Sequence, residues 1–169
     1  MIDWLKRAAA ISLVSLVAAC GGGNDHDDPH LNIVQTAQAD SQFSILVEAV
    51  VAADLATTLS GTGPFTVFAP TNTAFAALLT ELGVTKAALL ANKPLLTQVL
   101  TYHVLDGQVL KAQVPVDTPI TTLQGETFSI NSSLVITDQR ARTANITATD
   151  IRTTNGVIHV IDKVILPAP

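Results

Sequence analysis

Cysteine is nearly absent from this sequence, and the single copy, Cys20, excludes an intramolecular disulfide. A lone thiol also provides no Cys-x-x-Cys or Cys/His spacing that could hold a metal ion or a redox pair. The apolar run at residues 8–19 is too short to cross a hydrocarbon core of about 30 Å as a helix. A disulfide scaffold and a cysteine metal centre are therefore excluded, and this run is not expected to span a membrane.

Basic and aromatic residues are also scarce. The sequence has nine Lys and Arg residues and fourteen Asp and Glu residues, which gives a net charge of −5. No basic patch is present to neutralise phosphates, so nucleic acid is not expected as a partner. Arg140 and Arg142 form only a local pair, for which a solvated strand face is favoured over a site. Aromatic residues make up 4% of the chain, which disfavours a sugar-stacking platform and leaves hydrogen-bonded glycan recognition open.

The start of the chain has the pattern of an export signal. Two basic residues, Lys6 and Arg7, precede the apolar run, and the sequence "VAAC" ends it at Cys20. This ending resembles a bacterial lipobox, which implies a diacylglycerol on the Cys20 sulfur, cleavage before Cys20 and acylation of the new amino group. Two or more acyl chains give stable membrane anchoring where one does not. The alternative interpretation is a short buried N-terminal helix.

The residues after Cys20 are typical of a tether. The stretch "GGGNDHDDPH" is flexible and polar, and its Asp and His residues are better interpreted as a solvated linker than as a metal site without a scaffold. We therefore expect a signal peptide at residues 1–19, a lipidated cysteine and spacer at 20–30, and one globular domain at 31–169. Gly21 stands where lipoproteins retained in the inner membrane of Gram-negative bacteria have Asp, so for a Gram-negative host the resemblance implies the outer membrane or cell surface.

The period of the apolar residues changes along the globular part. Residues 31–102 show mostly helical spacing, interrupted by a short strand pattern at 65–70, with Asp40, Ser41 and Thr85 as candidate caps and Gly83 as a helix stop. Strand patterns follow at 126–130, 133–137, 146–151 and 157–166. Helices first and strands later predict an α+β fold.

Three motifs occur in order over one domain length. They are "FTVFAPTNTAFAAL" at residues 65–78, "LTYHVLDGQV" at 100–109 and "NGVIHVIDKVILP" at 155–167. Together they resemble the two terminal signature regions and the central Tyr-His motif of the fasciclin (FAS1) domain family. The resemblance implies an α+β wedge or sandwich of short β-strands packed with several short helices.

The same motifs can be interpreted from packing alone. In "VIHVIDKVI" both alternating faces are apolar, so this strand is expected to be central and buried. The helix after Pro70 is expected to be capped near residues 71–73, with Asn72 or Thr73 as the cap. A buried His103 or His159 could act as a general base or a pH sensor, but a histidine bonded to a backbone carbonyl or an Asp is favoured.

Two residue pairs are candidate binding sites because of the resemblance. In animal adhesion members of the family, an Asp-Ile pair before the last motif and the Tyr-His region are associated with integrin binding. Asp150-Ile151 and Tyr102-His103 occupy the corresponding places here. The favoured alternatives are a turn or capping role for Asp150, and a core role for Tyr102 with a partner for its hydroxyl.

These observations predict a non-catalytic, membrane-anchored lipoprotein that mediates cell adhesion or binds a protein or polysaccharide. The alternative is a periplasm-facing lipoprotein that binds a small molecule or envelope component, which a buried apolar pocket with a few polar groups would favour. An enzyme is not expected, because no Gly-x-Ser-x-Gly elbow accompanies the histidines. No cofactor or metal is expected, and the membrane is contacted through lipid on Cys20.

Overall fold

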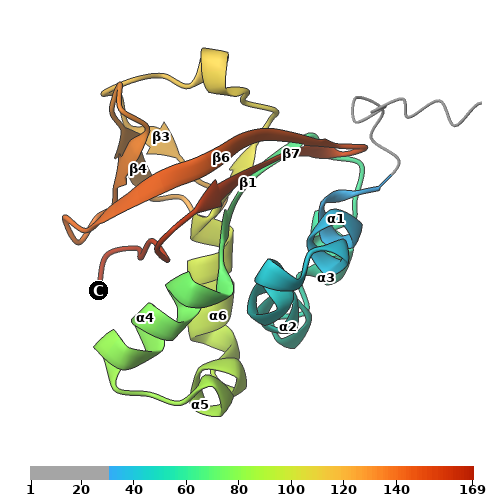
Figure 1. The fold of residues 1–169 in the computed structure, drawn as a ribbon, viewed down its shortest axis with the longest axis vertical. Helices are drawn as coiled ribbons and strands as arrows, with labels where there is room; N and C mark the ends of the chain where they lie inside the picture. The colour runs from blue at the N-terminus through green and yellow to red at the C-terminus, as the bar shows by residue number, and fades with distance from the viewer. Residues whose placement is uncertain (1–30) are drawn as a thin grey trace, which may run out of the picture.

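The computed structural model describes residues 31–169, and it confirms the α+β prediction (Figure 1). Helices occupy the first half of this region, and most strands occupy the second. The helices are α1 (Ile33–Ala39), α2 (Ser44–Ala52), α3 (Ala56–Leu59), α4 (Asn72–Leu82), α5 (Lys86–Ala91) and α6 (Lys93–Tyr102), with 3₁₀ turns η1 (Ser41–Phe43) and η2 (Lys111–Gln113).

The strands form one sheet in the order β2-β1-β7-β6-β5-β4-β3. The central pair β1–β7 is parallel, and the other pairs are antiparallel. Their bounds are β1 (Phe65–Pro70), β2 (Val104–Asp106), β3 (Ile120–Thr121), β4 (Thr127–Ile130), β5 (Val135–Thr137), β6 (Thr143–Thr153) and β7 (Gly156–Ile161).

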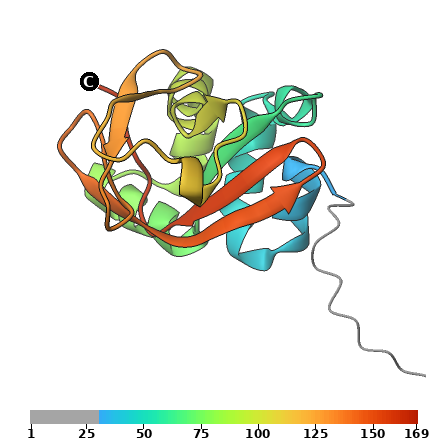
Figure 2. The ribbon, with the colours of Figure 1, turned by 90° about the horizontal axis from the view of Figure 1, so that it is seen from above.

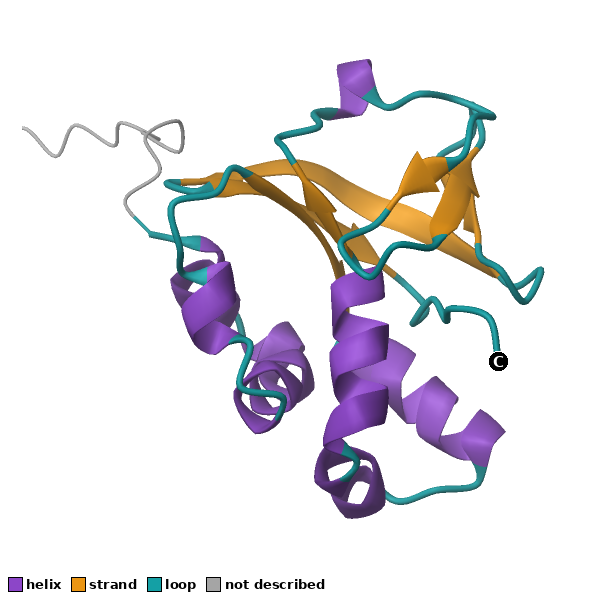
Figure 3. Cartoon of the chain, turned by 180° about the vertical axis from the view of Figure 1, so that it is seen from behind, coloured by secondary structure: helices purple, strands orange, loops and turns teal. Residues whose placement is uncertain are grey.

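The two central strands separate two apolar cores. Every residue of β7 is buried, as its two apolar faces predicted. Ile158 and Val160 pack into the core on the helical side, whereas Phe68 and Ile161 pack into the core beneath the small strands. Figure 1 shows the helices below β1 and β7 with β3 and β4 above, and the reverse view in Figure 3 shows the same two layers. Strands β1 and β7 thus form the middle of a wedge, between the helices and the small strands.

Side-chain caps begin several helices where the sequence predicted them. Asp40 accepts a hydrogen bond from the backbone of Gln42 at the start of η1, and Thr85 caps α5. Gly83 ends α4 with φ 64°. The cap of α4 lies within the predicted stretch 71–73, but it is Thr71, and not Asn72 or Thr73, that accepts from the Ala74 N–H.

Asn72 has a different role from the predicted cap. Its Oδ1 accepts from the Ile45 N–H at 3.0 Å, and its Nδ2 donates to the Ser41 carbonyl at 2.9 Å. Asn72 therefore satisfies backbone groups at the start of α2, a helix that has no side-chain cap of its own. A cap contributed across a tertiary contact has no local sequence pattern.

The last predicted strand was too long. The residues 157–166 were expected to be extended within the sheet, but β7 ends at Ile161. The following N–H groups of Ile165 and Leu166 donate to the side chains of His103 and Asp138 instead of a neighbouring strand. These buried side chains satisfy the backbone, so an apolar segment leaves the sheet without losing its hydrogen bonds.

Within residues 31–169, no helix is both long and apolar enough to cross a membrane. The predicted signal peptide, the lipidated Cys20 and the spacer at residues 21–30 lie outside the described residues.

Candidate binding site at the Asp150 bulge

Asp150 lies on an irregular part of β6. The pairing of β6 with β7 shifts register between Ile146 and Ala148 and again between Ala148 and Ile151. Asp150 itself has φ 59°, a left-handed conformation that Asp adopts more readily than most residues. Bulges of this kind turn a side chain away from the direction that a regular strand gives it. We call residues 149–152 the Asp150 bulge.

Three hydrogen bonds fix the Asp150 bulge against the loop after β2. The Lys111 N–H donates to Asp150 Oδ1 at 2.7 Å, and the Asp150 N–H donates to His159 Nδ1 at 3.3 Å. Since His159 Nδ1 accepts, its Nε2 carries the proton and donates to the Val109 carbonyl at 2.9 Å. The carboxylate is partly exposed, and within residues 31–169 only its Oδ1 has a hydrogen-bond partner.

The neighbours of Asp150 differ in exposure. Ile151 is partly buried and packs against the core on the helical side, whereas Arg152 is exposed. The bulge therefore presents one carboxylate in a fixed orientation, with the exposed Arg152 two residues later in the chain, while Ile151 faces the helical core. In Figure 2 the long β6–β7 ribbon lies along one side of the molecule.

Tyr102 and His103 lie in the core and not on this surface. Tyr102 is fully buried, and its hydroxyl donates to the Thr127 carbonyl at 2.9 Å. His103 is 2% exposed, with Nδ1 donating to the Val99 carbonyl at 2.7 Å and Nε2 accepting from the Ile165 N–H at 3.1 Å. These contacts confirm the core interpretation of both residues. Ligand binding by the Tyr102-His103 and Asp150-Ile151 pairs stays a prediction.

Packed rings connect the two predicted pairs inside the molecule. The Tyr102 ring meets the edge of Phe128 at a centroid distance of 5.9 Å, and Phe128 meets Phe68 at 5.2 Å. Phe68 in turn lies 5.4 Å from the His159 ring, which supports Asp150. The pairs thus share no surface, but the rings that begin at Tyr102 form part of the support behind the Asp150 bulge.

Burial sets the protonation of the two core residues. Desolvation lowers the pKa of His103 to about 4, against smaller opposing effects of the Val99 carbonyl and Asp138. Desolvation likewise raises the pKa of the Tyr102 hydroxyl well above its usual value. Both groups are therefore neutral near pH 7. The ring nitrogens of both His103 and His159 serve backbone hydrogen bonds in this structure.

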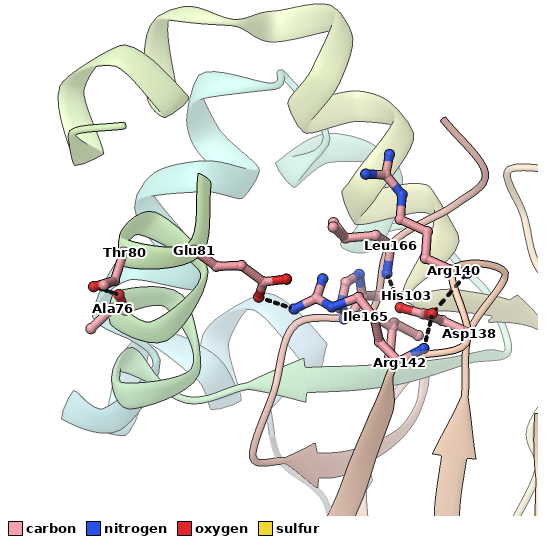
Figure 4. Close-up of polar contacts among 9 residues, drawn as sticks. All are labelled: Ala76, Thr80, Glu81, His103, Asp138, Arg140, Arg142, Ile165 and Leu166. Atoms are coloured by element: carbon pink, nitrogen blue, oxygen red, sulfur yellow. Dashed lines mark hydrogen bonds and ion pairs between the residues drawn. The ribbon is translucent and has the colours of Figure 1, made fainter. Parts of the chain in front are cut away.

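Arg140 and Arg142 are not the solvated strand face that we expected. They follow β5 in a turn organised by Asp138, whose Oδ1 accepts from both of their N–H groups at 2.9 Å (Figure 4). Arg142 Nη2 pairs with Glu81 at 2.6 Å, and Arg140 Nε donates to the Pro167 carbonyl at 2.8 Å. Asp138 is 5% exposed. The only sequence signal for it is its type, since Asp often bonds backbone N–H groups a few residues later.

Metal ligation finds no support in this region. Among residues 31–169, no group of three or more His, Cys, Asp or Glu side chains is close enough together to hold an ion.

Sequence reasoning missed the support that Lys111 and Val109 give to the Asp150 bulge, because both contribute backbone atoms. A backbone donor or acceptor has no signature in the residue type.

Comparisons with known proteins agree with this architecture. The fasciclin domain model matches residues 41–167. Protein sll1483 of Synechocystis is 46% identical over 143 residues, which cover 83% of this chain and 76% of that protein. Transforming growth factor-beta-induced protein ig-h3 of Sus scrofa is 36% identical over 141 residues, which cover 82% of this chain but only 20% of that protein.

A solved structure has a similar fold. It is a FAS1 domain pair from the insect cell adhesion molecule fasciclin I, with a TM-score of 0.72 and 18% identity. The match covers 82% of this chain and 51% of that one. The match to the family model, the relatives and the shared architecture together show that this chain belongs to the fasciclin domain family.

Proposed function

We propose that this protein is a non-catalytic adhesion lipoprotein, held to the bacterial envelope through lipid on Cys20, and that the Asp150 bulge contributes to binding a protein or polysaccharide. The similarity to a cell adhesion molecule supports a binding role. Many anchored copies on one membrane make weak individual contacts effective.

The observation that carries the proposal is the conformation of Asp150. A non-glycine residue at φ 59° costs about 1–3 kcal/mol and persists only where its surroundings enforce it. Here Lys111 and His159 enforce it and keep the carboxylate partly exposed. A carboxylate oriented in advance loses less entropy when it binds a donor or a cation on a partner.

The test of adhesion uses cells that carry the full-length protein. Their retention on arrays of immobilised proteins and polysaccharides is measured. Asp150→Asn removes the charge but keeps an oxygen for Lys111 and a residue that tolerates positive φ. Loss of one charge-assisted contact should weaken retention about tenfold. Asp117→Asn is the matched control, because Asp117 is an exposed Asp that also has a positive φ, 54°. Equal retention of both variants would contradict the proposed role of Asp150.

Anchoring and display are tested by membrane fractionation and by protease treatment of intact cells. The proposal expects the wild type in the membrane fraction and digested from outside, and Cys20→Ala released from the membrane. Unchanged fractionation of Cys20→Ala would disprove the lipid anchor. A membrane-bound protein that resists the protease would disprove surface display and favour the alternative, a lipoprotein facing the periplasm.

That second candidate function has one structural observation in its favour. A largely apolar cavity lies between α4, α5 and α6, lined by Gln98 and Arg140 as its polar residues. Apolar walls with a few polar groups are the usual composition of a small-molecule site.

A further inference from the structure

The cavity has a volume of about 230 Å³. Its walls include Leu78 of α4, Leu89 of α5, and Leu96 and Val99 of α6. An apolar cavity of about 150 Å³ in another protein is large enough to bind benzene. The space between these helices is thus sufficient for an apolar group, and Gln98 and Arg140 are the only polar residues that line it within residues 31–169.

The remaining wall is formed by residues 166–169, which we call the closing segment. It pairs with no strand, and side chains hold its backbone. Asp138 Oδ2 accepts from the Leu166 N–H at 2.9 Å, and Glu126 Oε2 accepts from the Ala168 N–H at 2.7 Å. Figure 4 shows Asp138 beside Leu166, with Arg140 extending from the same turn. Because these bonds to carboxylates are charge-assisted, they hold the wall in place.

Arg140 is the only charged residue that lines the cavity among residues 31–169. Its Nε donates to the Pro167 carbonyl of the closing segment. Its Nη1 and Nη2 have no hydrogen-bond partner within the described residues, so the guanidinium keeps donors that an anion can use. A single cation beside apolar walls is complementary to a ligand that has one anionic end and an apolar remainder.

The apolar lining also reaches the surface. Leu82 lines the cavity and is 40% exposed, and Val84, two residues later, is 38% exposed. An alkyl chain longer than the cavity can therefore continue over these side chains without entering water completely.

We propose that this cavity binds an amphipathic carboxylate, with its alkyl chain among the leucines of α4–α6 and its carboxylate at Arg140. The site lies apart from the Asp150 bulge, and the proposal does not depend on adhesion. Arg140 has two roles in it: its Nε fixes the closing segment, and its Nη groups bind the ligand.

The test is isothermal titration of the full-length protein with decanoate, below the concentration at which decanoate forms micelles, with decanol as the uncharged probe. We expect one saturable decanoate site per chain and at least about tenfold weaker binding of decanol, because a bond to a charged group is lost. No saturable binding of decanoate, or equal affinity for the two probes, would overturn the proposal.

Variants separate the two parts of the site. Arg140→Gln removes the Nε contact with the closing segment for both probes, so it should weaken decanoate about tenfold more than it weakens decanol, whereas Arg152→Gln, an exposed arginine on β6, should change neither. Leu95→Trp, at a partly buried lining position, should abolish binding of both probes, and Val51→Trp at a 55% exposed position should not. Each variant is first shown to unfold thermally like the wild type. Equal losses in the paired variants would mean nonspecific binding and overturn the assignment.

Discussion

The buried imidazole of His103 ties one helix end to the chain after β7. Its neutral form donates to Val99 and accepts from Ile165, and a second proton on Nε2 would remove the acceptor. Burial also disfavours the charged form of the imidazole. This desolvation is the largest effect on His103 and lowers its pKa from 6.5 to about 4 in the folded protein. In the unfolded chain the imidazole takes up its proton near pH 6.5.

This difference predicts a stability that depends on pH. Between pH 6.5 and 4 the unfolded state binds more protons than the folded state, so the free energy of unfolding falls as the pH falls. The loss reaches about 3 kcal/mol near pH 4. Urea unfolding at several pH values measures it. His103→Gln should be less stable at pH 7 but should lose less stability over this range, and an unchanged slope would contradict the assignment to His103.

Gly156 sets the distance between the central strands. A Cβ at this position would lie 2.0 Å from the Phe65 carbonyl oxygen, which belongs to the backbone of β1 and cannot rotate away. At Gly83, the left-handed end of α4, a Cβ would meet nothing within 4 Å. The two glycines thus have different reasons to lack a side chain, one of space and one of conformation.

Substitution by alanine should therefore lower the free energy of unfolding by different amounts at Gly156 and at Gly83. Gly156→Ala should lower the free energy of unfolding by about 3 kcal/mol or more, because β1 and β7 must separate. Gly83→Ala should cost about 1–2 kcal/mol, because alanine is strained in the left-handed region. Chemical denaturation of both variants measures the difference. Similar costs would show that the contact with Phe65 relaxes easily.

The sequence could predict those helices and strands whose bounds depend on residues close to them in the chain. β7 has two apolar faces, and α4 lies between Pro70 and Gly83, so both were located from residue type and spacing. The end of β7 and the turn at Arg140 could not be located, because remote side chains decide them. Likewise the left-handed Asp150 depends on the register between β6 and β7, which no single segment specifies.

The two cores share the central strands, so the whole domain should unfold as one unit. Phe68 packs beneath the small strands and Phe75 packs on the helical side. Each is 1% exposed, and truncation to alanine should cost about 3–5 kcal/mol in either core. Circular dichroism and tyrosine fluorescence should report one coincident transition for Phe68→Ala and for Phe75→Ala. Separate transitions in either variant would show that the cores fold independently.

The parallel contact of β1 with β7 has a consequence for the synthesis of the domain. β7 lies between β1 and β6, yet it is the last strand of the described residues 31–169. A ribosome must therefore release almost the entire domain before the sheet can gain its centre, and such distant pairing is slow. Until then neither apolar core is complete, so the domain cannot reach its stable folded state. The domain can therefore complete its fold only after β7 has been released, in whichever compartment it folds.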